Sequence, residues 1–289
     1  MKPISLTKNL VAAAVALLAL NAQAVVIDGN TYTCTGSCGQ LGADGNVTAP
    51  DGQYGYVTTS GSNVFFGVTP QQVSDSKVST GNGTSNGSKL VSSVFSTAGG
   101  AFSASFNYVS TDGNGFDDYS WARVIDATND NPVNNTVAWL FTARSTNSGT
   151  QQIVPGNLAF SVPTSTITNY ASYNFTQLDG SNGQFVNWSA LGAAAPGGLN
   201  GTGTCWETKK SNGGCGFTGW LDASVNLAAG NYRLEVGVMN FGDTLYDSGL
   251  AFNVPALAAP VPETGTAPMM LAALGAFGFL ARRRMNRSA

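Results

Sequence analysis

The chain has 289 residues, of which only 10% are charged, with 13 Lys or Arg, 16 Asp or Glu and no His. An average globular protein is about 25% charged, so the polarity here comes largely from Gly, Ser, Thr and Asn. The absence of His removes the commonest general base and the commonest metal ligand, which argues against an enzyme. The acidic balance argues against nucleic acid as a partner.

The N-terminal segment has the pattern of a secretory signal peptide. It has a basic start with Lys2 and Lys8, a largely apolar run from Asn9 to Leu20, and the exit sequence Ala22-Gln23-Ala24. A basic start, a short apolar core and an Ala-X-Ala exit are typical of such peptides. We therefore expect the secretion translocon to export the chain and signal peptidase to remove residues 1–24.

The body that follows consists of β-like stretches and turns almost throughout. Asp28-Gly29-Asn30 is a turn signal, and Ser79–Ser88, rich in Gly and Ser, is predicted to be a long surface loop. The predicted strands are Val25–Ile27, Thr31–Thr33, Tyr54–Thr59, Asn63–Val68, Leu90–Phe95, Ala101–Val109, Tyr119–Ile125, Val137–Ala143, Asn157–Val162, Thr218–Val225, Asn231–Asn240 and Gly249–Val254.

Two of these strands alternate most clearly between apolar and polar residues. One face of the first is predicted to carry Phe102, Ala104, Phe106 and Tyr108. The inward face of the second is predicted to carry Tyr232, Leu234, Val236 and Val238, with Arg233 and Glu235 outward.

Many short strands separated by turns predict an all-β fold, an antiparallel two-sheet sandwich of jelly-roll type. We assign residues 25–255 to this one domain and residues 256–260 to an extended Ala- and Pro-rich spacer. A signal helix and a short membrane helix are expected at the two ends of the chain.

The four cysteines form two close pairs, Cys34 with Cys38 and Cys205 with Cys215. In an exported protein an even number of cysteines predicts disulfides. Four cysteines allow three connectivities, of which local pairing is the simplest. The alternative use of the four thiols is a zinc site, which the predicted oxidising compartment disfavours.

Two acidic stretches stand out in a chain so poor in charge: Asp112–Asp118 and Asn240–Gly249, each directly before a predicted strand. Calcium binds six to eight oxygens from carboxylates, amides and carbonyls on a turning backbone. The predicted calcium ligands are Asp112, Asn114, Asp117, Asp118, Asp243 and Asp247. The competing interpretations are turn capping by the same side chains, which is the simpler one, and a glycosidase carboxylate pair.

Trp206 is the candidate ligand-binding residue. It lies between Cys205 and Cys215 with two lysines nearby, where an exposed indole would stack on a sugar ring. The alternative is core packing, which we expect for the tryptophans that lie in or beside predicted strands, namely Trp121, Trp139 and Trp220.

The C-terminal segment combines a short motif, an apolar run and a basic end. The motif is Val261-Pro262-Glu263-Thr264, the uncharged run covers residues 267–281, and Arg282, Arg283 and Arg284 follow. The run is shorter than the roughly 20 residues that span a bilayer comfortably, and its basic end fits the positive-inside rule.

This order of parts resembles the PEP-CTERM sorting signal, which is read by exosortases of Gram-negative bacteria. The family motif is Val-Pro-Glu-Pro, so Val261, Pro262 and Glu263 match it and Thr264 departs from it. With Gly265, the same stretch is one residue away from the Leu-Pro-X-Thr-Gly signal of Gram-positive sortases. Residues 102–126 and 230–253 are also similar to exported β-sandwich domains of exosortase-dependent proteins.

The resemblance implies a protein that is exported through the inner membrane, processed by an exosortase, and kept at the cell surface or in the extracellular matrix. Its implied role is structural or adhesive, in a biofilm or exopolysaccharide layer and with matrix components as partners. The alternative is a surface-displayed carbohydrate-binding module, with a hydrolase as a third interpretation.

Overall fold

The computed structural model describes residues 22–62, 86–112, 118–130, 135–144, 152–153, 165–167, 176–178, 186–192, 203, 205, 215–240 and 244–258. The compact unit to which these residues belong ends at Ala258. The predicted signal helix, the strands Asn63–Val68 and Asn157–Val162, and the sorting signal at 261–289 lie outside them. In the described part of the chain, no helix has the length and apolar composition needed to cross a bilayer.

The described residues form an all-β, antiparallel structure, which confirms that part of the prediction. Fourteen strands are assigned within them, and one 3-10 turn, η3, covers Ser189–Leu191. The strands are β1 Ala22–Ile27, β2 Asn30–Thr35, β3 Ser37–Leu41, β4 Tyr54–Thr58, β5 Gly87–Ser92, β6 Phe95–Ser110, β7 Tyr119–Asp126, β8 Thr136–Arg144, β9 Gln152–Ile153, β10 Thr166–Ile167, β11 Thr176–Gln177, β12 Gly216–Phe217, β13 Leu221–Met239 and β14 Ser248–Asn253.

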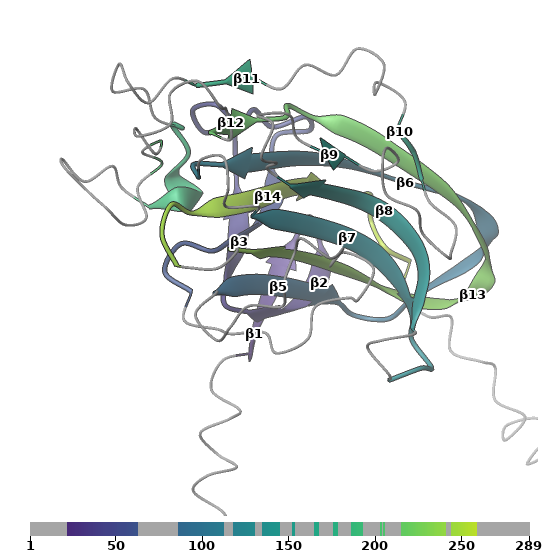
Figure 1. Cartoon of the computed structure of the whole chain (residues 1–289). Helices are drawn as coiled ribbons and strands as arrows, with labels where there is room; N and C mark the ends of the chain where they lie inside the picture. Colours follow the sequence, from purple (N-terminus) through teal and green to yellow (C-terminus); the bar gives the residue numbers. More distant parts are fainter. Residues whose placement is uncertain are drawn as a thin grey trace, which may run out of the picture. The chain divides into compact units, whose positions relative to one another are not determined.

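The strand pairings fall into two groups that share β13. The first half of β13 pairs with β6, which continues through β14 and β4 to β3. The second half of β13 pairs with β7 on one side and β5 on the other, and the ladder extends to β8 and β9 and to β2 and β1. In Figure 1 the long strands β6 and β13 run side by side and curve together at the right of the view.

Strand β13 differs from the prediction, which placed two strands at Thr218–Val225 and Asn231–Asn240. The ladder between β13 and β6 continues on both sides of Ala228 and Gly99, with Leu227 opposite Gly100 and Ala229 opposite Ala98. Gly99 and Gly100 have φ values of 96° and 125°, which favour Gly over other residues. Small side chains and two glycines therefore let both strands bend without losing their pairing.

Other boundaries also differ from the prediction: β1 begins at Ala22, inside the predicted signal peptide, and β6 begins at Phe95 rather than Ala101. The stretch Leu90–Phe95 is divided between β5 and β6, and β5 begins at Gly87, inside the predicted loop Ser79–Ser88. At the C-terminal end, Leu257 packs against the core and its N–H donates to Asn30 Oδ1 at 2.8 Å. The first residues of the predicted spacer therefore contact the body.

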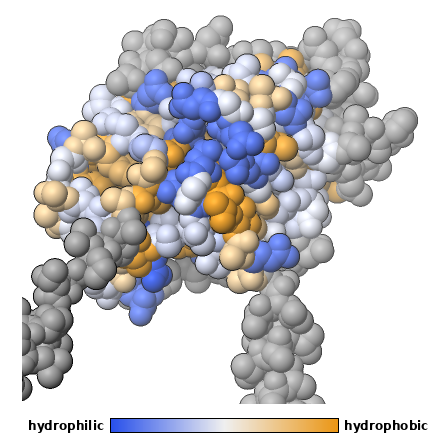
Figure 2. Space-filling model, turned by 180° about the vertical axis from the view of Figure 1, so that it is seen from behind, coloured by the Kyte–Doolittle hydropathy of each residue, from blue (hydrophilic) through white to orange (hydrophobic). Residues whose placement is uncertain are grey.

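The main core, here called the inner core, lies between the two groups of strands. Phe106 of β6 stacks on Phe141 of β8 with 5.1 Å between ring centroids, and Tyr32 of β2 meets Phe252 of β14 edge-on at 5.9 Å. The inward faces predicted from alternation are confirmed, since the inner core includes Ala104, Phe106, Tyr108, Tyr232, Leu234, Val236 and Val238. Figure 2 shows one face of the molecule, where hydrophilic residues form a band between hydrophobic patches.

Candidate functional site

The two acidic stretches meet at one end of the strands. Asp118 directly precedes β7, and its Oδ2 accepts a hydrogen bond of 2.7 Å from Ser248 Oγ at the start of β14. The carbonyl oxygen of Asp247 accepts hydrogen bonds from the backbone N–H of Thr111 at 3.1 Å and from its hydroxyl at 2.7 Å. The ends of stretches that lie far apart in the sequence are thus side by side.

A chain of buried hydrogen bonds continues from this point. Thr59 Oγ1 donates to Asp247 Oδ1 at 2.9 Å. Asn86 Nδ2 donates to the carbonyl oxygens of Thr59 and Ser62, at 3.0 and 2.7 Å. Asn240 Nδ2 donates to Asn86 Oδ1 at 2.9 Å.

We call the set of residues joined in this way the polar belt: Asn240, Asn86, Thr59, Asp247, Ser248 and Asp118. It joins the ends of β13, β5, β4, β14 and β7, and buried polar groups paired in this way tend to fix one arrangement of the strands.

Burial raises the pKa of the Asp247 carboxyl, and hydrogen bonds from Thr59 and Ser60 lower it by less. Asp112 and Asp118 are also buried. Ionised carboxylates away from water are costly unless charges or donors compensate them. At Asp247 and Asp118 part of that compensation comes from the hydroxyls of Thr59 and Ser248.

The residues present fit a calcium ion only in part. Asn114, Asp117 and Asp243 lie outside the described residues. Within the described residues, no group of three His, Cys, Asp or Glu side chains could hold a metal. Asn240 Oδ1 is buried there and accepts no hydrogen bond, and it is an oxygen of the kind that calcium binds. The calcium site therefore stays a prediction, and its further ligands would have to come from residues 113–117 and 241–243.

A second polar cluster lies on the outward face of β13 and β7. Glu235 is directly opposite Arg123 in the ladder, and Arg123 Nε donates to Glu235 Oε1 at 2.7 Å. Trp121 Nε1 donates to the same oxygen at 2.9 Å, and Lys89 Nζ lies 3.7 Å from Oε2. Arg123 also donates from Nη1 to Thr136 Oγ1 at 2.7 Å. Glu235 points outward as predicted, yet it and Arg123 are buried.

This cluster keeps the Glu235 carboxylate ionised. Burial raises the pKa of Glu235, but the charge and hydrogen bond of Arg123, the charge of Lys89 and the hydrogen bond from Trp121 outweigh it and hold the pKa below its usual range. A carboxylate held in this state is a poor proton donor at neutral pH. The arrangement is that of a structural ion pair.

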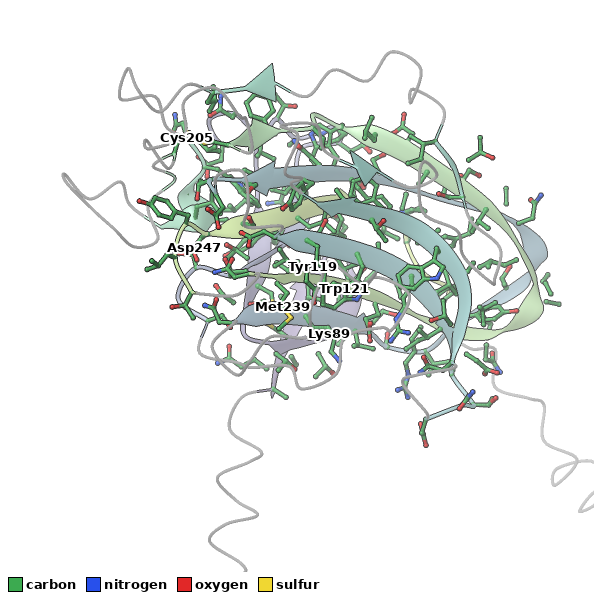
Figure 3. All side chains as sticks on the ribbon, viewed as in Figure 1. Lys89, Tyr119, Trp121, Cys205, Met239 and Asp247 are labelled. Carbon is green, nitrogen blue, oxygen red and sulfur yellow. A yellow bond between two sulfur atoms is a disulfide. The ribbon has the colours of Figure 1, made fainter. Side chains whose placement is uncertain are left out.

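Aromatic and sulfur groups border the ion pair. Tyr119 Oη donates to Met239 Sδ at 3.1 Å, and the rings of Tyr119 and Trp121 lie 5.9 Å apart. The Trp121 ring lies against Gly237, where any Cβ would overlap with the indole. Figure 3 shows Lys89, Tyr119, Trp121 and Met239 near one another, with Asp247 at the left-hand end of the strands. These buried rings pack the sheet face, as predicted for Trp121.

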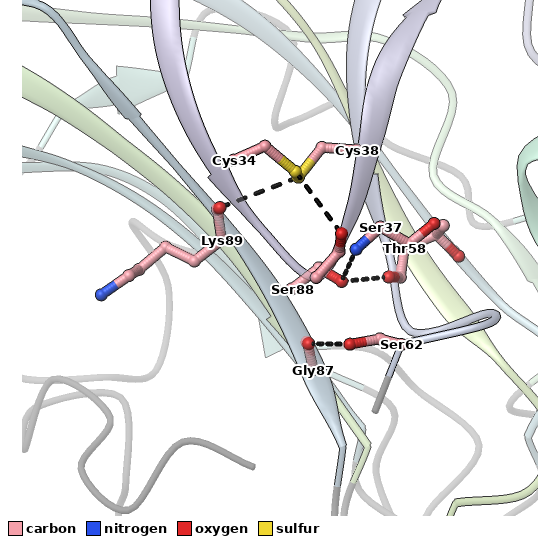
Figure 4. Close-up of a disulfide and its surroundings, with 9 residues drawn as sticks. Cys34, Ser37, Cys38, Thr58, Ser62, Gly87, Ser88 and Lys89 are labelled. Atoms are coloured by element: carbon pink, nitrogen blue, oxygen red, sulfur yellow. Dashed lines mark hydrogen bonds between the residues drawn. A yellow bond between two sulfur atoms is a disulfide. The ribbon is translucent and has the colours of Figure 1, made fainter. Parts of the chain in front are cut away.

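Both predicted local disulfides are present. Cys34–Cys38 joins β2 to β3, and so joins the two strand groups at one corner (Figure 4). Ser88 Oγ of β5 accepts from the Ser37 N–H at 2.7 Å and donates to the Thr58 carbonyl at 2.6 Å. Gly36 has a φ of 96°, and a Cβ there would lie 2.8 Å from the Gly87 carbonyl oxygen. The corner is therefore closed by a disulfide, by a shared serine and by a position that requires Gly.

Cys205–Cys215 belongs to a second apolar cluster, here called the outer core, on the outward face of β4, β14 and β6. Trp188 Nε1 donates to Tyr54 Oη at 2.9 Å, and both rings are buried. The two cysteines are buried in the same cluster, with 5.5 Å between their Cα atoms. Trp206, the predicted ligand-binding residue, follows Cys205 directly but lies outside the described residues.

The sequence interpretation missed the Arg123–Glu235 pair, although one signal was present. Trp121 and Ile125 alternate with Ala122 and Val124 in β7, so both faces of this strand are apolar and a buried strand is indicated. A charged residue in such a strand needs a partner of opposite charge. Which of the acidic residues supplies it depends on long-range pairing.

No protein-family model matches this chain, and neither the curated proteins nor the solved structures include a significant match. All four cysteines are in disulfides, bonds that form and persist in oxidising compartments.

Proposed function

We propose that this chain is an exported structural or adhesive protein of the bacterial cell surface or extracellular matrix. The observation that carries the proposal is the pair of disulfides, one closing a corner of the fold and the other buried in the outer core. Such bonds suit an oxidising environment outside the cytoplasm. The low charge of the chain suits a hydrated matrix.

The geometry of β1 is compatible with removal of a signal peptide after Ala24, although cleavage there would remove the pairing of Ala22, Gln23 and Ala24 with Thr35, Cys34 and Thr33 of β2. Ala22, Gln23 and Ala24 form the exposed outer end of this edge strand. After cleavage, Val25, Val26 and Ile27 keep their pairing with β2, and Ile27 keeps its place in the inner core. The mature body therefore loses little buried surface.

We also propose that the body is a two-sheet sandwich of jelly-roll type, which is the more specific part of the predicted all-β fold. Its support is the division of the strands into two groups with the inner core between them. Cys34–Cys38 and the shared strand β13 would then close opposite margins of the sandwich.

Processing of the C-terminal segment gives the direct test. The protein is recovered from the cell envelope and the medium of its host, and both ends are determined by mass spectrometry. We expect an N-terminus at Val25 and loss of the residues beyond Pro262-Glu263. A mature protein that still carries Arg282, Arg283 and Arg284 would show a plain membrane anchor and would contradict sorting.

A matched pair of variants separates the two sorting enzymes. Thr264→Pro restores the exosortase motif and removes the Thr that a sortase needs, so processing should continue unchanged. Glu263→Ala breaks the Pro-Glu motif and should leave the precursor in the membrane. Loss of processing in Thr264→Pro would instead indicate a sortase.

A carbohydrate-binding module is the second candidate function. It is favoured by the Cys205–Cys215 disulfide, because both cysteines are buried in the outer core and Trp206 lies between them in the sequence. A glycan array probed with the wild-type protein and with Trp206→Ala tests it, and binding that does not depend on Trp206 would remove this residue from the candidate site.

A further inference from the structure

A polar surface lies on the outward face of β13, β6 and β14. Asp222, Ser105 and Asn253 are directly opposite one another on these three adjacent strands. Ser224 and Ser103 form a second opposed pair two residues along, and therefore on the same face. We call these five residues the serine-aspartate face. All of them are exposed or half-exposed.

The side chains of this face are held in place by hydrogen bonds across the strands. Ser105 Oγ donates to Asp222 Oδ1 at 2.6 Å, and Ser103 Oγ donates to Ser224 Oγ at 3.0 Å. Asn253 Nδ2 donates to Asp51 Oδ2 at 3.1 Å, which extends the row beyond β14. A row of ordered polar groups costs less conformational entropy when it binds a ligand than free side chains would.

An aromatic ring lies close to this row. Trp220 comes two residues before Asp222 and is half-buried. Its Nε1 donates to the carbonyl oxygen of Thr48 at 2.7 Å, and its ring packs edge-on against Tyr54 with 5.7 Å between centroids. The indole is thus held in a fixed position beside the polar row.

We propose that the serine-aspartate face binds a neutral polysaccharide. Sugar hydroxyls both donate and accept hydrogen bonds, and they match a mixture of carboxylate, hydroxyl and amide groups. Adjacent strands lie about 4.8 Å apart, close to the length of one pyranose unit, so successive sugars would meet successive strands. Asp222 and Asp51 give the surface an acidic character, which disfavours anionic polymers.

This proposal rests on the proposed extracellular role, because only there would the face meet a polysaccharide layer. It assigns binding to the sheet face rather than to Trp206. The two sites are separable by mutation, since Ser103 and Asp222 lie on β6 and β13, whereas Trp206 lies between Cys205 and Cys215 in the sequence.

The test is affinity electrophoresis of the full chain in gels that contain dextran, soluble starch or alginate. We expect at least one of the two neutral polymers to retard the wild-type protein and alginate not to. Ser103→Lys places a long side chain across the face and should weaken retardation at least tenfold. Asp222→Asn replaces a charged hydrogen-bond acceptor with a neutral amide and should lower the affinity for the neutral polymer about fivefold.

Two control variants carry matching changes elsewhere: a hydroxyl residue replaced by Lys, and an Asp replaced by Asn. Thr33→Lys alters an exposed strand residue on β2, and Asp130→Asn alters an exposed acid outside the face. Both should bind as the wild type does, and all four variants should melt within a few degrees of it. Unaltered binding by Ser103→Lys, an equal loss in the controls, retardation by alginate alone, or no retardation at all would each overturn the proposal.

Failure of this proposal is distinguishable from failure of the proposed function. A protein that is processed and found at the cell surface but is not retarded by a neutral polymer contradicts only the binding face. A protein that binds dextran or starch but is never exported contradicts the extracellular role.

Discussion

The inner and outer cores are both tightly packed, yet they are built in different ways. The inner core is made by strands whose ladders already fix the backbone, as with Phe106 of β6 and Phe141 of β8. The outer core holds irregular segments on the sheet: the Trp188–Tyr54 hydrogen bond holds the segment around Trp188 and η3, and the disulfide joins Cys205 to Cys215, which directly precedes β12. Where no ladder orders the chain, covalent and side-chain bonds take over that role.

The largest effect is expected in the inner core. Phe106→Ala removes a fully buried ring stacked on Phe141, and should lower the free energy of unfolding by about 3–5 kcal/mol. Denaturant unfolding of the protein measures it. Phe102→Ala on the same strand is the control, because this ring is only half-buried and should cost clearly less. Equal losses would contradict the expectation that full burial makes the Phe106 ring contribute more than the half-buried Phe102 ring, which packs at the margin of the same core.

The ion pair on the outward face of β13 should respond almost as strongly when only one partner is removed. Glu235→Leu leaves the Arg123 guanidinium buried without its carboxylate and should cost about 3–5 kcal/mol. The double variant Arg123→Met with Glu235→Leu should recover most of that loss, because no buried charge of the pair remains. A double variant as unstable as the single one would contradict this account.

The same pair predicts a pH dependence with a definite sign. The pKa of Glu235 is lowered in the folded protein, so its stabilising contribution is present above the unfolded pKa and is lost as the pH falls through the folded pKa. As the pH is lowered into the mildly acid range, the melting temperature of the Arg123→Met, Glu235→Leu double variant should therefore fall less than that of the wild type.

Removal of either disulfide should lower the free energy of unfolding by a smaller amount, and the two disulfides should stabilise different parts of the fold. The chain-entropy relation gives about 3 kcal/mol for the Cys205–Cys215 loop and about 2 kcal/mol for the shorter Cys34–Cys38 loop. Cys205→Ser with Cys215→Ser should speed hydrogen exchange in the outer core while the inner core stays protected. Equal exchange throughout both cores would show that they unfold as one unit.

The smallest effect concerns Asp247 in the polar belt. The pKa of Asp247 is raised in the folded protein, so ionisation of this carboxyl destabilises the fold. Its contribution to stability is fully present below the unfolded pKa and is lost as the pH rises through the folded pKa. Without calcium, Asp247→Asn should therefore melt slightly above the wild type at neutral pH. If calcium binds here, a chelator should lower the melting temperature of the wild type and have less effect on the variant. An unchanged melting curve in excess chelator would remove the calcium site.

Local patterns predicted the inner core well, because side-chain alternation follows directly from strand geometry. The alternation placed Phe106 and Leu234 inward correctly without knowledge of any partner strand. The same reasoning predicted two strands where β13 is one, since Ala229 and Gly230 resemble a break until the opposing small residues of β6 are known.

The candidate sites depended more on long-range pairing. The acidic stretches were recognised from composition, but nothing local indicates that Asn86 and Thr59 connect Asn240 to Asp247. Glu235 appeared to be an ordinary outward residue, and only the register of β13 against β7 brings it to Arg123, 112 residues away.

By itself the sequence determined the all-β class, the inward faces of the strands and the two local disulfides, because each depends on residues that are close together along the chain. The tertiary structure decided which strands are neighbours, and with that the closed corner, the polar belt, the buried ion pair and the serine-aspartate face. Each of these joins residues far apart in sequence, whose meeting is set by the pairing of whole strands rather than by any local preference.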